Sequence, residues 1–243
     1  MGKLDGKVAL VTGSSRGIGK GIARGMAREG ASVVLTARDA DALRATADEL
    51  AATGSTILAV PTDVTDEKQV DALFARTMDR LGRLDVLVNN AGAFDNGPLD
   101  EISIEAWDHV IAVNLRGPFL CTRLAMRIMK RQGGGRIINI GSISAQRVRP
   151  HSAPYSASKH GLWGLTQVTA LEGRDYGIVC SCLHPGNVLV ERRATSTAPT
   201  DAEPMMTVDE LAETAVLMAT LPPHVNMLEA IVLPVGQLYI GRG

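Results

Sequence analysis

Short, predominantly apolar segments alternate with amphipathic stretches along the whole chain. Segments of this kind lie at 8–11, 31–36, 56–60, 84–88, 136–140, 178–183 and 229–233. A strand that is buried on both faces needs apolar side chains at successive positions, so such segments are typical of a parallel sheet covered on both sides. The pattern therefore predicts seven parallel strands.

The stretches between these segments have the spacing of amphipathic helices, with signals at their ends. Asp39 is typical of a residue that begins a helix, and Thr207 with Glu210 has the form of a capping box. Gly82 marks a helix end, and Gly117-Pro118 predicts a break in the long stretch that ends near residue 133. The predicted helices cover 17–29, 39–54, 66–81, 103–133, 155–176 and 207–221.

The regular alternation of strand and helix predicts an α/β fold with one seven-stranded parallel sheet and helices on both of its faces. No linker or internal repeat interrupts the alternation, so residues 1–243 are expected to form a single domain. The segment 191–206 is different, because it is rich in Thr, Ala, Pro and charged residues and has no clear periodicity. We interpret it as a mobile substrate loop near the carboxyl ends of the strands, where such sheets bind ligands.

Composition narrows the range of partners. The chain has 25 Lys and Arg against 26 Asp and Glu, a formal net charge of −1, which leaves no basic field for nucleic acid or an anionic membrane. No apolar run has transmembrane length, and no secretory signal is recognisable. The three cysteines and five histidines have neither zinc nor redox spacing. We therefore expect buried free thiols, no metal and a cytoplasmic protein.

A glycine-rich turn follows the first predicted strand and opens the first predicted helix. Its sequence is Thr-Gly-Ser-Ser-Arg-Gly-Ile-Gly over residues 12–19. The glycines let the backbone turn sharply and approach a pyrophosphate, while the helix N-terminus supplies N–H groups and a positive dipole. The strand–turn–helix context predicts a dinucleotide-binding Rossmann fold. The alternative is a glycine-rich turn that binds nothing, whereas a P-loop is excluded because no Gly-Lys-Ser/Thr follows.

The end of the second predicted strand bears on which dinucleotide binds. A carboxylate there would bind the adenosine ribose of NAD(H) and repel the 2′-phosphate of NADP(H). That position is Thr36, and Arg38 follows it closely. Arg38 and Arg16 could both face a 2′-phosphate through charge-assisted hydrogen bonds, whereas Asp39 is better placed as a helix cap. NADP(H) is therefore favoured, with NAD(H) as the alternative.

The later strands are each followed by a short polar motif. In chain order the motifs are Asp63-Val64, Asn89-Asn-Ala-Gly92, Asn114 within the next helix, Ser142, Tyr155-Ser-Ala-Ser-Lys159 and Pro185-Gly186. Together with the glycine-rich turn, this series resembles the short-chain dehydrogenase/reductase family along the whole chain, above all its 3-oxoacyl-acyl-carrier-protein reductase-like members. The resemblance implies a nicotinamide-dependent oxidoreductase that interconverts a carbonyl group and an alcohol.

The resemblance also implies which residues contact the cofactor. Asp63 would accept a hydrogen bond from the adenine amino group, and Val188 would contact the nicotinamide amide. One position departs from the family pattern, because the threonine often found four residues after the glycine of Pro185-Gly186 is Val190 here. One cofactor hydrogen bond is therefore missing or replaced, with Asn187 as the candidate replacement. The implied contacts are Gly13, Ser15, Arg16, Gly17, Ile18, Gly19, Thr36, Arg38, Asp63, Val64, Asn90, Ala91, Gly92, Tyr155, Lys159, Pro185, Gly186 and Val188.

Hydride transfer at carbon requires a proton to move on the attached oxygen. A phenol is a poor base at neutral pH unless a nearby ammonium group stabilises the phenolate. Tyr155 and Lys159 are four residues apart on a predicted helix, so their side chains share one face. Tyr155 is then the general acid in reduction and the general base in oxidation. By resemblance, Lys159 also reaches the nicotinamide ribose, Ser142 holds the substrate oxygen, and Asn114 holds a water that links Lys159 to solvent.

These inferences favour an NADP(H)-dependent carbonyl reductase or alcohol dehydrogenase that acts on a small molecule. One alternative is an NAD(H)-dependent alcohol dehydrogenase working mainly in oxidation, and another is a catalytically silent dinucleotide-binding protein on the same fold. We expect substrate specificity to depend on the loop after Phe94 and on the segments 146–151 and 191–206. By resemblance, the protein forms a homo-oligomer, either a tetramer or a dimer.

Overall fold

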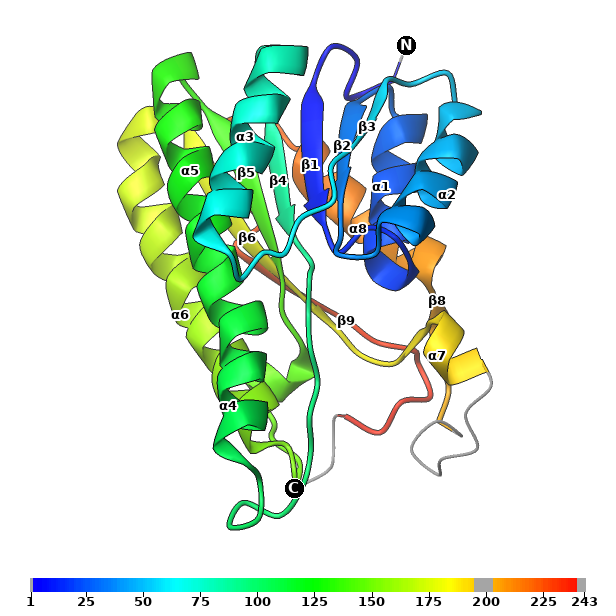
Figure 1. The fold of residues 1–243 in the computed structure, drawn as a ribbon, viewed down its shortest axis with the longest axis vertical. Helices are drawn as coiled ribbons and strands as arrows, with labels where there is room; N and C mark the ends of the chain where they lie inside the picture. Colours follow the sequence, from blue (N-terminus) through cyan, green and yellow to red (C-terminus); the bar gives the residue numbers. More distant parts are fainter. Residues whose placement is uncertain (1, 195–202, 240–243) are drawn as a thin grey trace.

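The computed structural model describes residues 2–194 and 203–239. Its strands are β1 Val8–Thr12, β2 Ser32–Thr36, β3 Ile57–Ala59, β4 Val86–Asn89, β5 Gly135–Ile140, β6 Ile178–Pro185, β7 Val188–Leu189, β8 Met206–Thr207 and β9 Glu229–Val232. Within the described residues, seven of them form one sheet in the order β3-β2-β1-β4-β5-β6-β9, with every neighbouring pair parallel (Figure 1). This confirms the predicted seven-stranded parallel sheet.

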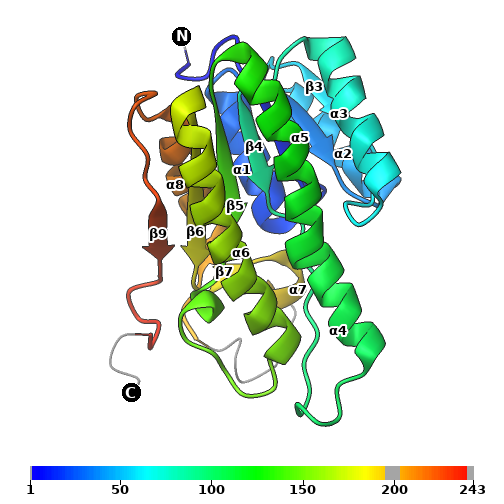
Figure 2. The ribbon, with the colours of Figure 1, turned by 90° about the vertical axis from the view of Figure 1, so that its left-hand side faces the viewer.

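Helices cover both faces of this sheet, as predicted. They are α1 Gly17–Arg28, α2 Ala40–Ala51, α3 Glu67–Leu81, α4 Ile104–Ile111, α5 Gly117–Gln132, α6 Ala153–Gly173, α7 Glu191–Ala194 and α8 Val208–Thr220. One layer contains α1, α2 and α8, and the opposite layer contains α3, α5 and α6 (Figures 1 and 2). Short connections return the chain to the next parallel strand after most of these helices, which is the arrangement of a Rossmann fold.

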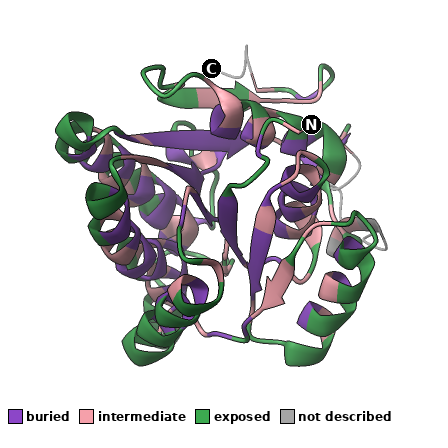
Figure 3. Cartoon of the chain, turned by 90° about the horizontal axis from the view of Figure 1, so that it is seen from above, coloured by how far each residue is buried: buried purple, intermediate pink, exposed green. Residues whose placement is uncertain are grey.

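Alternate residues of each strand point to opposite faces, and both faces are apolar. In β1, Ala9 and Val11 join the core beneath α1, α2 and α8, whereas Val8 and Leu10 join the core beneath α3 and α5. Figure 3 shows buried strands in the middle of the molecule and exposed outer surfaces on the helices. Burial on both faces explains why these strands are continuously apolar rather than alternating in sequence.

Four of the α-helices in the described part of the chain begin at a side-chain cap. Asp39, Asp66, Ser103 and Thr207 each accept a hydrogen bond from a backbone N–H in the first turn of the helix that they precede. Thr207 and Glu210 form the predicted capping box, in which each side chain accepts from the backbone N–H of the other. These contacts satisfy amides that have no partner within the helix.

The predicted break at Gly117-Pro118 is wrong. The chain passes from α4 into a π-helical turn, Ala112–Arg116, and then directly into α5, so that the three form one column (Figure 2). Pro118 lies in the first turn of α5, directly after the π-helical turn. The irregularity is instead the widened turn that contains Asn114, and such π-turns often occur at functional sites.

The segment 191–206 is more regular than predicted. It begins with the helix α7, which is too short to show a periodic pattern, and Met206 pairs with Val188 in a two-stranded parallel sheet. Residues 195–202, which the loop prediction also covers, lie outside the described residues. The helix predicted from 155 in fact begins at Ala153, because Pro154 is well suited to a first helical turn.

Candidate active site

A cavity of about 420 Å³ is lined by residues that follow β1, β2, β3 and β4. Carboxyl ends of parallel strands meet at this edge, where open α/β sheets bind ligands. Thr36 does not line the cavity, because it is fully buried and its backbone is hydrogen-bonded to Ser14. The predicted cofactor residues that do line it are Gly13, Ser15, Arg16, Ile18, Arg38, Asp63, Val64, Asn90, Ala91 and Gly92.

The glycine-rich turn is held against the neighbouring strand β4. Thr12 Oγ1 accepts hydrogen bonds from the N–H groups of Asn90 and Ala91, both at 3.0 Å. Asn90 Nδ2 in turn donates to the carbonyl oxygens of Thr12 at 2.8 Å and Gly13 at 3.0 Å. A Cβ atom at Gly19 would collide with Asn90 Nδ2 and with the backbone of Gly13. The turn is therefore closely packed on its inner side and leaves its backbone exposed to a ligand on the other.

The helix α1 begins directly after the turn, with neither a side-chain cap nor an acidic residue in its first turn. Its first amide, Gly17 N–H, donates instead to Glu191 Oε1 at 3.1 Å. Val190, at the position where the family often has threonine, lies over the same glycine. A carboxylate at this helix N-terminus shows that the position accepts an anion, as the phosphates of a dinucleotide require. The residues present therefore fit a dinucleotide.

Two arginines line the same cavity, Arg16 and Arg38. Among the described residues, neither forms an ion pair with a carboxylate. Asp39 follows Arg38 directly, but its Oδ1 accepts from Ala42 N–H at 3.0 Å and so caps α2, as predicted. Asp63 Oδ1 accepts from the backbone and hydroxyl of the nearby Thr65. The two guanidinium groups are thus available to a negatively charged ligand.

Tyr155 and Lys159 lie one turn apart on α6. Lys159 is buried, and its Nζ donates to the carbonyl oxygen of Ile140, the last residue of β5, at 2.8 Å. The same Nζ atom lies 5.6 Å from the centre of the Tyr155 ring. Phe94 contacts that ring edge to face, with centroids 5.1 Å apart. The lysine is therefore fixed at the sheet edge beside a half-buried tyrosine.

Ser142 follows β5 and is buried, and its Oγ accepts from Ser144 N–H at 3.1 Å. Its backbone contacts the fully buried His184 of β6, whose Nδ1 lies 2.8 Å from the Ser142 carbonyl oxygen and 3.2 Å from its N. His184 Nε2 is 3.3 Å from Glu229 Oε1. Burial is the largest influence on His184 and lowers the pKa of its ring. A Cβ at Gly141 would press on the same ring, so the serine, the glycine and the histidine are tightly packed.

Asn114, in the π-helical turn, is 1% exposed. Its Oδ1 accepts from Ala93 N–H at 2.7 Å, and its Nδ2 donates to the Ala93 carbonyl at 2.9 Å and to Ser158 Oγ at 3.1 Å. The side chain therefore joins the chain after β4 to α6, between Tyr155 and Lys159. The predicted water link from Asn114 to Lys159 stays a prediction.

Asn187, the candidate replacement for the missing threonine, has protein partners at both ends of its side chain. Its side chain donates to Glu203 Oε2 at 2.9 Å and accepts from Arg193 Nη1 at 3.3 Å. Its backbone N–H donates to Gln237 Oε1 at 2.8 Å, and its carbonyl accepts from Met206 N–H at 3.0 Å. All four polar groups bind protein atoms, so Asn187 holds the chain after β6 in place, and its contact with the cofactor stays a prediction.

The comparison with known proteins decides the family. The sequence of the chain matches the family model for short chain dehydrogenases over residues 7–201, which is most of the chain. The chain belongs to the short-chain dehydrogenase family. The resemblance inferred from the ordered motifs is thereby confirmed.

Relatives and solved structures agree with this assignment. This short-chain dehydrogenase is 38% identical over 213 residues to a 3-oxoacyl-[acyl-carrier-protein] reductase of Synechocystis sp., covering 87% of this chain and 85% of the relative. It is 41% identical over 199 residues to a D-beta-hydroxybutyrate dehydrogenase of Rhizobium meliloti, covering 80% and 77%. A solved metagenomic short-chain oxidoreductase in complex with NADP has a TM-score of 0.85 at 37% identity, covering 96% and 98%. The chain is therefore an oxidoreductase.

Two residues of this short-chain dehydrogenase, His184 and Gln237, support the site without having been predicted to do so, and Glu191, which was predicted only as part of the substrate loop, contacts the glycine-rich turn. Their contacts join distant parts of the chain, because Glu191 and Gly17 are 174 positions apart and Gln237 and Asn187 are 50 apart. Such pairs have no local sequence signal. His184 alone among them had an indirect sequence signal. The parallel pairing of β5 with β6 brings His184 beside the residues that follow Ile140.

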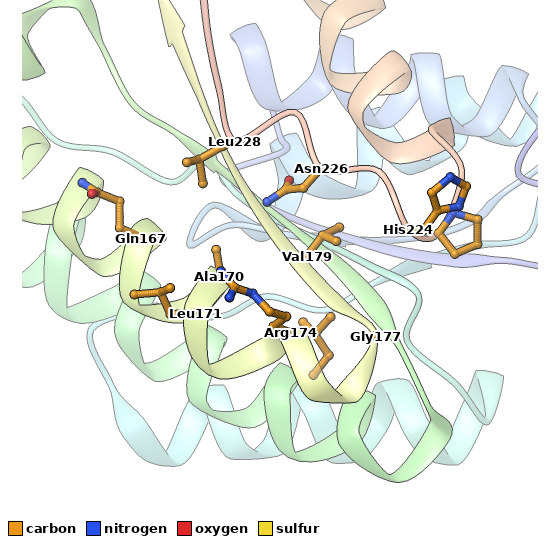
Figure 4. A pocket seen from close by; sticks show the side chains of 11 residues that line it. Gln167, Ala170, Leu171, Arg174, Gly177, Val179, His224, Asn226 and Leu228 are labelled. Atoms are coloured by element: carbon orange, nitrogen blue, oxygen red, sulfur yellow. The ribbon is translucent and has the colours of Figure 1, made fainter.

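A larger cavity, of about 730 Å³, lies elsewhere in the molecule. It is lined by the end of α6, the start of β6 and residues 223–228 (Figure 4). Because Ile178 and Val179 begin β6, this cavity lies at the amino end of that strand, whereas the predicted site residues follow carboxyl ends. None of the predicted catalytic or cofactor residues lines it. Size alone therefore does not identify the site.

Other potentially reactive groups lie apart from the site or in the core. Cys121, Cys180 and Cys182 are free and buried, as predicted. Burial raises the pKa of the Cys121 and Cys182 thiols to about 12, so neither is a nucleophile at neutral pH. In the part of the chain that the structure describes, no helix combines the length and apolar character needed to cross a membrane.

Proposed function

We propose that this short-chain dehydrogenase uses NADP(H) to interconvert a carbonyl compound and a secondary alcohol, with Tyr155 as general acid and base. One observation carries the proposal: the buried Lys159 is held by the Ile140 carbonyl with its ammonium group beside the Tyr155 ring. A fixed positive charge near a phenol stabilises the phenolate, which is the form that accepts a proton in oxidation. The glycine-rich turn and its cavity lie at the same edge of the sheet, where they would bind the cofactor.

The bound nicotinamide supplies a hydride in reduction and accepts one in oxidation. Tyr155 donates a proton to the carbonyl oxygen in reduction and removes one from the hydroxyl group in oxidation. Ser142 orients the substrate oxygen, because its hydroxyl accepts from Ser144 N–H and keeps its own hydrogen free to donate. Asn114 fixes the position of α6, and hence of Tyr155, against the chain after β4.

The two arginines of the cavity support NADP(H) over NAD(H). A 2′-phosphate would meet Arg16 and Arg38, and charge-assisted hydrogen bonds from guanidinium groups to phosphate are strong. The neighbouring carboxylate of Asp39 is directed to the first turn of α2. The solved relative that contains NADP agrees with this preference. The NAD(H)-dependent dehydrogenase and the catalytically silent binder are the alternatives.

The proposal is tested by measuring NADPH and NADH oxidation by the purified protein with a panel of aldehydes, ketones and 3-oxoacyl thioesters. The reverse reaction is measured with 3-hydroxy acids and simple secondary alcohols. We expect turnover with NADPH, and we expect Tyr155→Phe to lower kcat by about 10²–10⁴-fold. The variant should still bind NADPH, because phenylalanine preserves the ring contact with Phe94.

Two results would contradict the proposal in different ways. Tight NADPH binding by the wild type, without turnover of any carbonyl or alcohol, would favour the silent binder. Unchanged turnover in Tyr155→Phe would exclude Tyr155 as the proton carrier while leaving the oxidoreductase activity intact.

The segments that surround the site would determine which substrate binds. We propose that Phe94 and the segments 146–151 and 191–206 shape the substrate site, since Phe94 contacts the Tyr155 ring and is more than half exposed. The single-domain organisation, the homotetramer or homodimer and the cytoplasmic location stay predictions.

A further inference from the structure

The N-terminus of α1 differs from those of α2, α3, α4 and α8. In each of those four helices, the side chain of the residue directly before the helix accepts from an amide of the first turn. Arg16, which precedes α1, has no acceptor group to offer, and the first turn of α1 has no acidic residue. The amides and the positive end of the helix dipole are therefore left for a group from elsewhere in the chain.

The group found there is the carboxylate of Glu191. Gly17 N–H donates to its Oε1 at 3.1 Å, and its Oε2 would lie 3.6 Å from a Cβ atom built on Gly17. Both oxygens therefore lie close to the backbone of the glycine-rich turn. The contact is at the surface, because Glu191 is an exposed residue. A phosphate group that approached this helix N-terminus would seek the same amide.

The chain on both sides of Glu191 is anchored, so the position of its carboxylate follows from the fold. Before it, Val188 pairs with Met206 in the β7–β8 sheet. After it, the Arg193 N–H donates to the Val190 carbonyl at 2.8 Å. The Arg193 side chain also donates to Asn187. These contacts place Glu191 at the start of α7, facing the start of α1.

We propose that Glu191 competes with the cofactor's diphosphate for the N-terminus of α1 and thereby lowers the affinity for nicotinamide dinucleotides. The inference rests on the proposed function, because it requires a dinucleotide at the glycine-rich turn. Two anions at one helix N-terminus repel each other, so the carboxylate moves aside or opposes the ligand. Since NADPH and NADH share the diphosphate, Glu191 weakens the binding of both to the same extent.

Isothermal titration calorimetry with NADPH, NADH and 2′-AMP tests this competition. Glu191→Gln removes the charge and keeps the shape, and Glu191→Ala removes the whole group. We expect both variants to bind NADPH and NADH about two- to fivefold more tightly, the range for a charge at an exposed helix N-terminus. The gain should be larger at low salt, where screening is weaker. Binding of 2′-AMP, which has no diphosphate, should not change.

Glu213→Gln is the matched control, because it removes one negative charge from an exposed position on α8. It should bind all three ligands as the wild type does. Equal or weaker binding of NADPH by both Glu191 variants would overturn the inference, as would an equal gain for 2′-AMP. If the wild type binds neither NADPH nor NADH, it is the proposed function that fails. Thermal unfolding midpoints confirm that each variant is folded before its affinities are compared.

Discussion

The glycine-rich turn and the described residues between 186 and 207, which are 186–194 and 203–207, both border the candidate site, but they are held in different ways. The turn is fixed by backbone groups and by two short side chains, Thr12 and Asn90, on adjacent strands. The other segment is held by the pairing of β7 with β8 and by bonds in which the side chains of Gln237, Glu203 and Arg193 contact Asn187. The glycine-rich turn, which we call the rigid wall or first wall, therefore suits the part of a ligand that does not vary. The other segment, which we call the second wall, can change its side chains, and hence its specificity for a ligand, without disturbing the sheet.

The sharpest test of this comparison is the same substitution in each wall. Gly19→Ala places a methyl group against the backbone of Gly13, which the sheet holds in place. We expect it to lower the free energy of unfolding by about 1–3 kcal/mol and to abolish binding of NADPH. Gly186→Ala meets only side-chain atoms of Gln237 and Leu233, which can turn away. Gly186→Ala should lower the free energy of unfolding by about 1 kcal/mol, which is the contribution of the hydrogen bond from Asn187 to Gln237.

Urea unfolding and calorimetric titration with NADPH measure both variants side by side. If Gly186→Ala is as destabilising as Gly19→Ala, the second wall is as rigid as the first and the comparison fails. Gly164→Ala controls for adding a methyl group, since Gly164, like Gly19, lies in a helix and has no positive φ, but has open space around its Cβ position.

A second prediction concerns the charges on the rigid wall. Arg38→Asp replaces a cation of the cavity with the carboxylate that NAD-binding proteins use at this end of a strand. We expect the preference for NADPH over NADH, measured as a ratio of kcat/KM values, to fall by about ten- to a hundredfold. Arg44→Asp, on the exposed side of α2, reverses the same charge outside the cavity and should leave the ratio unchanged. An unaltered ratio in Arg38→Asp would contradict the assignment of NADP(H).

The rigid wall could be predicted from the sequence because its signals are local. A buried strand, a glycine-rich turn and a helix follow one another within residues 8–28, and the structure has them in that order. Asp39 and Thr207 cap the helices that they precede for the same reason. The positions of Asp63 and Asn90 shortly after strands were also sufficient to predict that both residues line one cavity.

The parts that could not be predicted depend on contacts across the chain. The π-helical turn at 112–116 accompanies the burial of Asn114 against Ala93 and Ser158, which no local pattern specifies. The segment after β6 is ordered by Gln237 and Glu203, whose partner Asn187 is far away in sequence. Local sequence therefore indicates where the walls of the site begin, and tertiary contacts determine the shape of the second wall.

The smallest expected effect concerns the fully buried His184, which contacts the backbone of Ser142. Burial lowers the pKa of His184 below its ordinary value near 6.5, although the Ser142 carbonyl and Glu229 act in the opposite direction. The unfolded chain therefore takes up this proton more readily than the folded one. The stability that neutral His184 contributes is complete above about pH 6.5 and is lost as the pH falls from there toward the lower folded value.

We therefore expect the free energy of unfolding, measured in urea at pH 7.5 and 5.5, to decrease more in the wild type than in His184→Gln. The difference can be no more than about 1.4 kcal/mol per pH unit, the limit for one proton. His224→Gln removes an exposed histidine and should retain the pH dependence of the wild type. If His184→Gln shows the same dependence as well, the histidine that supports Ser142 is not a site of proton-linked stability, and packing alone holds its ring in place.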